Sequence, residues 1–261
     1  MSENKQQYLK SCAVLCANKI VGSSANNEYF TAPYKHLVID DFLPSELADY
    51  CLKHFPPLDD AIWQHENDLD VEVKSRTIWK SEFDIPVGII DVVRLLNSAP
   101  ILNAISQRFG IPKIIPDPYF TGGGLNVTSR GGLLDVHVDG NYHDKMGLTR
   151  RFNAILYLNP GWQEDWGGEF GIYNDSGDIC VKKVAPLFNR LIIFHTHDYS
   201  YHGLPDPINF PSEEFRRSVI LYYYTKQERP PEESSVQKPH SALWKKRAMT
   251  DKRGNKTRDF D

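Results

Sequence analysis

The feature that most constrains the fold is a series of short apolar segments that begins after Pro118. They are rich in β-branched and aromatic residues, and turn-forming residues separate them: GGGLNVTS, LLDVHVDGN, FNAILYLN, GGEFGIYN, RLIIFHT and RSVILYYYT. Runs of this composition bounded by turn residues are typical of strands. Because no helical period lies between the segments, they predict an antiparallel β-barrel or jelly roll.

The N-terminal part of the chain has helical rather than strand patterns. Residues 8–20 have the spacing of a short amphipathic helix, and YKHLVIDDFLPSELADYCLKHFP predicts a strand followed by a helix with Ser45 as its N-cap. IPVGIIDVVRLLNSAPILNAISQRFGI predicts two helices that break around residues 99–100. Residues 61–83 show no clean period and predict a loop with short strands. The expected fold class is therefore α+β, with helices preceding a β core.

Length and composition indicate a single soluble globular domain with appendages, since 41% of the 261 residues are hydrophobic and 25% are charged. We expect a helical arm over residues 1–30, a main domain over 31–225 with its β core from about residue 118, and a C-terminal extension over 226–261 that packs on the barrel and ends in a basic tail. The net charge of −4 gives no overall basic field, so nucleic acid is not indicated as a partner.

The cysteines and the N-terminus indicate a reducing compartment. Cys12, Cys16, Cys51 and Cys180 are too few and too irregular for a disulfide framework, and none forms a Cys-x-x-Cys pair. We expect Cys12 and Cys16 to be buried thiols. The N-terminal sequence lacks a basic leader, and its apolar part is too short and too polar for a signal or membrane helix. These features predict a cytoplasmic protein without a membrane partner.

The sharpest chemical feature is a His-x-Asp sequence, His137 and Asp139, in a predicted strand. Residues two apart on a strand project to the same face and can bind one ion together. Two histidines and one carboxylate on one face leave positions open for a cosubstrate and oxygen, as Fe(II) oxygenases require. The third ligand is expected from a later strand edge, among His195, His197 and His202. We favour His202, because the 63 residues after Asp139 leave room for the strands that return the chain beside it.

A second cluster of residues could bind a dicarboxylate cosubstrate. Arginine matches a carboxylate with two parallel donors, and Arg216 and Arg217 open the last predicted strand. Adjacent residues of a strand point to opposite faces, so at most one of the two faces the barrel interior. Tyr157 in AILYLN is a second candidate donor, although an aromatic residue in a β core is more often structural.

These residues resemble the prolyl 4-hydroxylase-like branch of the 2-oxoglutarate/Fe(II)-dependent oxygenase superfamily. The resemblance runs from YKHLVIDDFLPSELADYCLKHFP to about residue 247, and its most specific part is the series GGLLDVHVDGN, RRFNAILYLNPGW, WGGEFGIYN, PLFNRLIIFHTHDYSYHGLP and RRSVILYYYT. It implies a double-stranded β-helix, a jelly-roll or cupin-like barrel, with supporting N-terminal helices. It also implies that residues 31–225 form the oxygenase domain and that His137, Asp139 and His202 bind the iron.

The resemblance further implies the reaction and its cofactors. With Fe(II), 2-oxoglutarate and O2, such an enzyme hydroxylates an aliphatic C–H bond and releases succinate and CO2; ascorbate is expected as a stimulant. The substrate would be an amino-acid-like small molecule or a prolyl or other peptidyl residue. Arg216 and Tyr157 would hold the cosubstrate carboxylate, with Arg217 outside. Asp139 occupies the place that family halogenases leave for chloride, and Thr128 stands where collagen-type enzymes have a tyrosine, so some cosubstrate contacts differ.

Other residues and other functions stay open at this point. By analogy with related hydroxylases, Arg150 would lie near the mouth and meet an anionic or peptide substrate, whereas His143, His195 and His197 are expected to be structural or to support the ligands. One alternative is a cupin-like metal dioxygenase or isomerase that does not use 2-oxoglutarate. Another is a non-catalytic binding barrel that contacts nucleic acid through the basic tail from Lys245.

Overall fold

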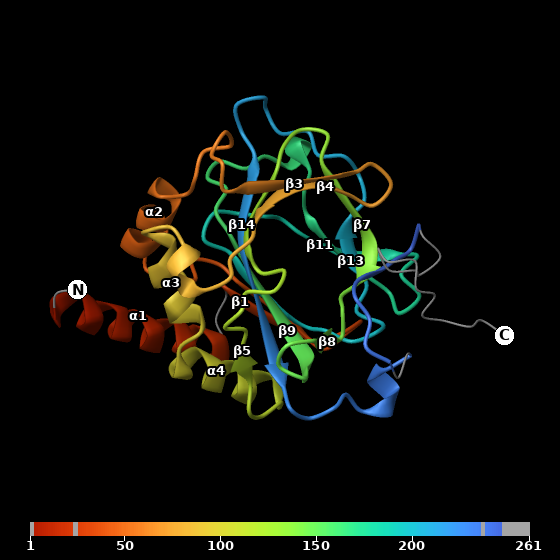
Figure 1. Cartoon of the computed structure of the whole chain (residues 1–261), viewed down its shortest axis with the longest axis horizontal. Coiled ribbons are helices and arrows are strands. Elements are labelled where there is room, and N and C mark those ends of the chain that lie inside the picture. The colour runs from red at the N-terminus through yellow and green to blue at the C-terminus, as the bar shows by residue number, and fades with distance from the viewer. Residues whose placement is uncertain (1–2, 23–25, 236–237, 247–261) are drawn as a thin grey trace.

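The computed structural model describes residues 3–22, 26–235 and 238–246 of the chain (Figure 1). The α-helices among them lie on one side of a curled β-sheet and come from the first half of the sequence. They are α1 (Glu3–Val21), α2 (Ser45–Lys53), α3 (Ile89–Leu96) and α4 (Ala99–Phe109). Short 3-10 turns occur at Glu82–Asp84, Glu164–Trp166 and Pro231–Glu233.

The described strands form a single sheet in which every pairing is antiparallel. Its main path runs β1-β2-β12-β9-β14-β6-β4-β7-β13-β10-β11, and β3, β5, β8 and β15 add to this path at its sides. The strands are β1 (Asn27–Phe30), β2 (His36–Ile39), β3 (Trp63–Asp68), β4 (Glu72–Thr77), β5 (Ile115–Pro116), β6 (Gly124–Thr128), β7 (Leu133–Val138), β8 (Tyr142–His143), β9 (Leu148–Tyr157), β10 (Phe170–Tyr173), β11 (Cys180–Val184), β12 (Leu191–His195), β13 (His202–Leu204), β14 (Arg216–Thr225) and β15 (Leu243–Trp244).

The sheet curls until its two halves pack against each other. Side chains of β10 and β11 share one buried cluster with side chains of β9 and β12, which lie in the other half of the strand order. The curled antiparallel sheet is consistent with the expected double-stranded β-helix, and the six strands predicted from the sequence are confirmed as β6, β7, β9, β10, β12 and β14.

Strand β9 shows why the predicted strands had almost continuous apolar sequences. Phe152, Ala154 and Leu156 face the main core under the helices, whereas Ile155 and Tyr157 face the second cluster inside the curled sheet. A strand covered on both faces needs apolar residues at successive positions instead of a strict alternation.

The N-terminal helix is longer than expected and belongs to the main core. It begins at Glu3, packs on α3 and α4, and buries Cys12, Cys16 and Ile20. The Cys16 thiol donates a hydrogen bond to the carbonyl oxygen of Phe42 at 3.3 Å. All four cysteines are free thiols, and Cys12 and Cys16 are buried as predicted.

The structure corrects one expectation for the N-terminal half and adds detail to another. Pro44, rather than Ser45, is the N-cap of α2, because the Pro44 carbonyl already accepts from the backbone N–H groups of Leu47 and Ala48. Residues 61–83, expected to be loop with short strands, contain two six-residue strands, β3 and β4, which pair as a regular hairpin. The apolar alternation that would have indicated β4 is missing, because alternate residues of this strand are charged and face a cavity.

The C-terminal segment returns to the barrel as a strap, which we define as residues 226–235 and 238–246. Its strand β15 pairs with the end of β7, so that Leu243 lies opposite Val138 and Trp244 opposite His137. Most of the basic tail, residues 247–261, lies outside the described residues.

Within the part of the chain that the structure describes, no single helix is long and apolar enough to cross a membrane. The pair α3 and α4 meets the length and composition of a span only when taken together, across a bend of 48°. Both helices bury their apolar side chains in the main core.

Candidate active site

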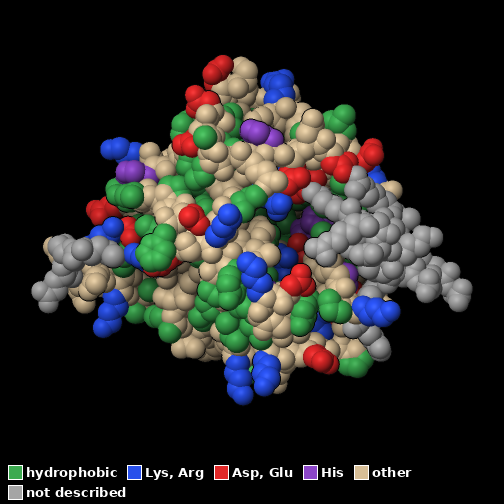
Figure 2. Space-filling model, viewed as in Figure 1, with side chains coloured by type: hydrophobic (Ala, Val, Ile, Leu, Met, Phe, Trp, Pro, Cys, Tyr) green, Lys and Arg blue, Asp and Glu red, His purple; other side chains and the backbone are tan. Residues whose placement is uncertain are grey.

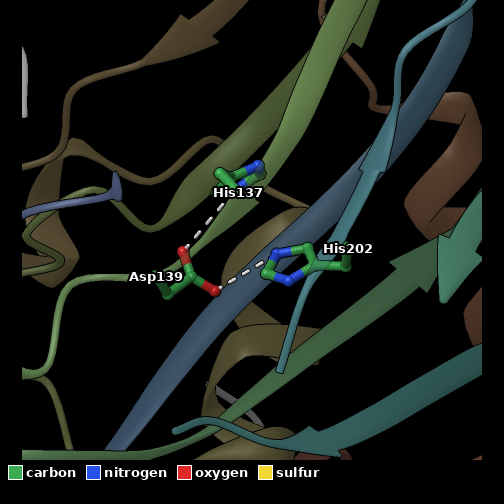
Figure 3. A group of neighbouring side chains, drawn as sticks. All are labelled: His137, Asp139 and His202. Atoms are coloured by element: carbon green, nitrogen blue, oxygen red, sulfur yellow. Dashed lines mark ion pairs between the residues drawn. The ribbon is translucent and has the colours of Figure 1, made fainter. Parts of the chain in front are cut away.

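Strand pairing brings three predicted metal ligands together. His137 lies in β7, Asp139 directly follows that strand, and His202 is the first residue of β13. The register of β13 against β7 sets His202 opposite His137, and all three side chains converge on one point (Figure 3). His202 lies in the sequence YHGLPDP, which predicts the end of a strand, but in the structure it begins one, because the chain turns back after β12 to pair with β7.

The three side chains offer one donor atom each within a small buried space. Their ligand atoms all lie within 4.8 Å of one another, with His202 Nε2 at 3.3 Å and His137 Nε2 at 4.0 Å from the Asp139 carboxylate. Each imidazole uses its other nitrogen on a backbone carbonyl: His137 Nδ1 lies 2.8 Å from Asp135 O, and His202 Nδ1 lies 2.9 Å from Ser200 O. An Nδ1–H that donates to a carbonyl leaves the Nε2 lone pair for a metal.

The electrostatics of the group fit a divalent metal ion. Burial lowers the pKa of His137 to about 3, so its imidazole is neutral at pH 7. Burial alone would raise the pKa of Asp139, but the Arg150 guanidinium and the His202 and His137 imidazoles together outweigh burial and hold this pKa well below its ordinary value. A neutral imidazole and an ionised carboxylate are the protonation states that metal binding requires. The residues present therefore fit an Fe(II) site.

A cavity of about 570 Å³ opens at this group (Figure 2). Histidine and acidic side chains are visible inside a hollow on the face shown in Figure 2. The cavity walls combine the three ligands with apolar side chains, cations and strap residues: Ile155, Phe170, Leu204 and Ile220; Lys74, Arg76, Lys145, Arg150 and Arg216; Pro239, His240, Ser241, Ala242 and Trp244. The three candidate metal ligands and Arg216, the arginine predicted to bind the cosubstrate, thus line the same cavity.

The two arginines that open β14 point in different directions. Arg216 is buried and lines the cavity; its Nε donates to Gly168 O at 2.7 Å, and its guanidinium donates to the Tyr157 hydroxyl at 3.2 Å. Arg217 is only half-buried and pairs with Glu214 at 3.3 Å. Tyr157 is fully buried, and burial raises the pKa of its phenol, which stays neutral behind Arg216.

Gly168 allows the close approach of Arg216. Its φ of +81° lies in the left-handed region, which residues other than glycine rarely adopt. A Cβ at this position would meet Arg216 Cδ at 3.1 Å and Ile208 Cγ2 at 3.3 Å. Gly168, the second glycine of the predicted GGEFGIYN segment, therefore positions Arg216 in two ways. Its carbonyl accepts a hydrogen bond from the arginine, and its lack of a side chain leaves room for the arginine.

Arg150 lies deeper than a position at the mouth would suggest. It is 8% exposed, and its guanidinium lies 3.5 Å from Asp139 Oδ1 and 3.4 Å above the Tyr222 ring. Asn153 joins the two residues, because it accepts from Arg150 and donates to Asp139. Sequence reasoning overlooked Asn153, although a polar residue within the apolar run RRFNAILYLN was the available signal.

The other three histidines singled out in the sequence, His143, His195 and His197, do not belong to the candidate metal site. His143 is buried, and its Nε2 lies 3.1 Å from an Asp117 carboxylate oxygen at the cavity wall. His195 contacts Glu233 of the strap at 3.4 Å, and His197 accepts a hydrogen bond from a backbone N–H at 3.2 Å. These contacts hold loops and the strap in place.

The strap supplies a wall of the cavity that sequence reasoning did not foresee. Trp244 is buried and packs on the His137 imidazole, with ring centroids 4.6 Å apart and planes inclined by 33°. Asp198 fixes the strap from the loop before β13, through contacts with Arg229 at 2.7 Å and with His240 at 3.2 Å. The C-terminal extension was expected to pack on the barrel, but nothing in the sequence indicated that its Trp244 would lie beside His137, a candidate metal ligand.

Comparison with known proteins agrees with this geometry. Residues 123–225, which run from just before β6 to the end of β14, match the model of the family described as the 2OG-Fe(II) oxygenase superfamily. Two curated relatives are named prolyl 3-hydroxylase OGFOD1. The one from Mus musculus is 30% identical over 86 residues, and the one from Xenopus laevis is 32% identical over 106 residues. The matches cover 31% and 38% of this chain, but only 15% and 20% of the relatives' lengths.

Two solved structures share the fold. One is a prolyl hydroxylase from Trichoplax adhaerens in complex with a peptide fragment of the hypoxia inducible factor oxygen degradation domain, with a TM-score of 0.54, 18% identity, and coverage of 86% of this chain and 94% of that chain. The other is a prolyl-4-hydroxylase from Pseudomonas putida, with a TM-score of 0.54, 16% identity, and coverage of 83% and 100%. At these identities the similarity shows the fold alone.

Proposed function

Because residues 123–225 match the model of the 2OG-Fe(II) oxygenase superfamily, we propose that this chain is a 2-oxoglutarate-dependent Fe(II) hydroxylase and that its catalytic domain extends over residues 31–225. The observation that carries the proposal is the meeting of two separate binding groups in one cavity. His137, Asp139 and His202 offer the donors of a metal site, and Arg216 offers a buried cation for an acid. A site that binds only a metal would need no such arginine.

In this proposal each group has a distinct task. His137, Asp139 and His202 bind Fe(II), which when bound supplies the redox chemistry that activates O2. Arg216 binds the distal carboxylate of 2-oxoglutarate, and Tyr157 holds the guanidinium in place by accepting one of its hydrogen bonds. Ionised Asp139 stands at the place that family halogenases leave for chloride, which favours hydroxylation.

The cavity wall supports the same chemistry. Apolar side chains, including Ile155, Phe170 and Leu204, line it between the cations. Such residues exclude water, so the attraction between Arg216 and a carboxylate is stronger than it would be at the surface. Succinate and CO2 would be the products from 2-oxoglutarate, with one oxygen atom placed on the substrate carbon.

We propose a prolyl residue within a peptide or protein as the substrate. Both curated relatives are named prolyl 3-hydroxylases, and one structural neighbour was solved with a peptide. The cavity supports this choice because its wall includes Lys74 and Arg76 of β4 and Ser241 of the strap, whose donor groups fit the backbone carbonyl oxygens of a peptide. A cupin-like enzyme without 2-oxoglutarate is disfavoured, since it gives Arg216 no task.

The proposal can be tested by following succinate release and substrate mass in one reaction. The purified full chain would be incubated with Fe(II), 2-oxoglutarate and ascorbate, together with a library of proline-containing peptides or with free proline. We expect succinate release and a gain of one oxygen atom on a peptide, and neither with Asp139→Ala. Oxidation of free proline alone would replace the peptide substrate with a small molecule. The absence of 2-oxoglutarate turnover under every condition would refute the hydroxylase function.

A further inference from the structure

The Asp139 carboxylate faces His137 and His202, and it also contacts two side chains of β9, Arg150 and Asn153. Asn153 Nδ2 donates to Asp139 Oδ2 at 2.6 Å, and the Arg150 guanidinium lies 3.5 Å from Asp139 Oδ1. Arg150 Nε also donates to Asn153 Oδ1 at 2.9 Å. The three residues therefore form a closed ring of contacts in which each touches the other two.

A β-bulge makes this ring possible. Residues three apart on a regular strand point to opposite faces, so Arg150 and Asn153 would normally diverge. Where β9 pairs with β14, however, Tyr223 lies opposite Phe152 and Tyr224 lies opposite Arg150, so the register shifts by one residue. The extra residue turns Arg150 to the face that already carries Asn153. Bulges of this kind are often found beside active sites, where they re-aim a side chain.

The ring fixes the orientation of the Asn153 amide. Asn153 is 3% exposed, and its oxygen is occupied by Arg150 Nε, so its Nδ2 must face Asp139. Arg150 in turn is fixed by the Tyr222 ring, which lies 3.4 Å from its guanidinium carbon. Rotating the amide would place its oxygen against the carboxylate and its N–H groups against a cation. Such a rotation replaces two attractions with two repulsions.

We propose that Asn153, oriented by Arg150, is a positioning residue that holds the Asp139 carboxylate in its metal-binding orientation. This inference rests on the proposed function, because it concerns the same metal site. It goes beyond that function in giving Arg150 a task before any substrate is bound. The guanidinium contacts Asp139 at 3.5 Å and donates to Asn153 at 2.9 Å, so it is already engaged with the group that positions the ligand carboxylate.

Cobalt binding to the apo protein provides a test that needs neither substrate nor 2-oxoglutarate. Co(II) would be titrated into the full chain and its visible absorption recorded for the wild type, Asn153→Ala and Asn153→Asp. Loss of a residue that supports a ligand typically weakens metal binding by about 10- to 100-fold. We expect a loss of this size for Asn153→Ala and a larger one for Asn153→Asp, which removes the N–H donor and adds a second negative charge beside Asp139.

Asn159 provides the matched control. It is also buried and follows the same strand, but its amide bonds to the backbone of Pro186 and Arg217, away from the metal ligands. Asn159→Ala should lower the melting temperature and leave Co(II) affinity within about twofold of the wild type. If both alanine variants weaken Co(II) binding equally, the effect is one of general stability and the positioning role is wrong.

A double-mutant cycle tests whether Arg150 acts through Asn153. Arg150→Ala should weaken Co(II) binding strongly in the wild type and much less in Asn153→Ala, because the amide it orients is then absent. Additive losses would overturn the coupling, and wild-type affinity in Asn153→Ala would overturn the whole inference. Failure of the wild-type protein to bind Co(II) would instead refute the proposed metal site, and the positioning role with it.

Discussion

The strap should depend on a single buried carboxylate, Asp198. This residue is fully buried and sits against the Arg229 guanidinium, which is also buried, at 2.7 Å. It also accepts from the backbone N–H of Ser235 at 2.8 Å and lies 3.2 Å from His240 Nε2. Asp198→Ala would remove all of these contacts and leave the buried Arg229 guanidinium beside neutral oxygen atoms, the Arg150 carbonyl and the Thr196 hydroxyl.

The expected cost is large, because removal of one partner of a buried ion pair typically destabilises a protein by about 3–5 kcal/mol. In a chain of this length, about 1 kcal/mol corresponds to roughly 2–4 °C in melting temperature, so we expect a decrease of about 6–20 °C. The free energy of unfolding would be measured by urea titration and the melting temperature by calorimetry. Trp244 fluorescence would report on the strap itself in a variant that retains this tryptophan alone.

An exposed ion pair on the same strap gives the control. Lys245 contacts Asp178 at 3.0 Å, but the Asp178 side chain is 63% exposed, and surface pairs contribute little to stability. Asp178→Ala should therefore unfold like the wild type. If Asp198→Ala also unfolds like the wild type, the buried network does not hold the strap, and the reasoning from burial is refuted.

Three further predictions concern the cavity and the pH dependence of stability. Arg216→Ala should raise the KM for 2-oxoglutarate by about 10- to 150-fold, as expected for loss of a charge-assisted contact, and an equal rise in Arg217→Ala would show that the wrong arginine was chosen. Gly168→Ala forces a left-handed φ on alanine and crowds Arg216, so it should cost about 1–2 kcal/mol in urea titrations and also raise the KM for 2-oxoglutarate; unchanged kinetics would show that the arginine has room to adjust. Burial and neighbouring arginines lower the pKa of His195 to about 2 and that of His197 to about 4, so the unfolded chain binds more protons than the folded one below pH 6.5, and stability should fall as the pH falls from about 6.5 towards 4. Urea titrations across this range should show that the free energy of unfolding falls less steeply in His197→Asn than in the wild type. An identical fall would show that His197 does not contribute to the pH dependence of stability.

The sequence predicts much of this architecture because its β core follows local rules. Six strands were recognisable from composition and turn residues, and the His-x-Asp spacing on a strand required that His137 and Asp139 share a face. The choice of His202 needed only enough intervening chain to bring a later strand back. These inferences depend on period and length, which a linear sequence contains.

The features that escaped prediction depend on strand register and long-range contact. The bulge in β9 decides that Arg150 and Asn153 share a face, and nothing in RRFNAILYLN marks the extra residue. Hairpin β3–β4 has no apolar alternation because its inner residues line a polar cavity. Trp244 reaches His137 through pairing between residues more than a hundred positions apart. Contacts of this kind depend on how distant strands pair in the folded chain, and local sequence patterns do not reveal them.

The combined metal and cosubstrate site can be examined by anaerobic titration of Fe(II) and 2-oxoglutarate into the apo protein. The signal is the weak visible charge-transfer band that forms when 2-oxoglutarate chelates iron in such a site. We predict that the band appears with the wild type, disappears in Asp139→Ala, and requires more 2-oxoglutarate in Arg216→Ala. Fe(II) binding without any band would contradict the oxygenase function and leave a metal protein that does not use 2-oxoglutarate.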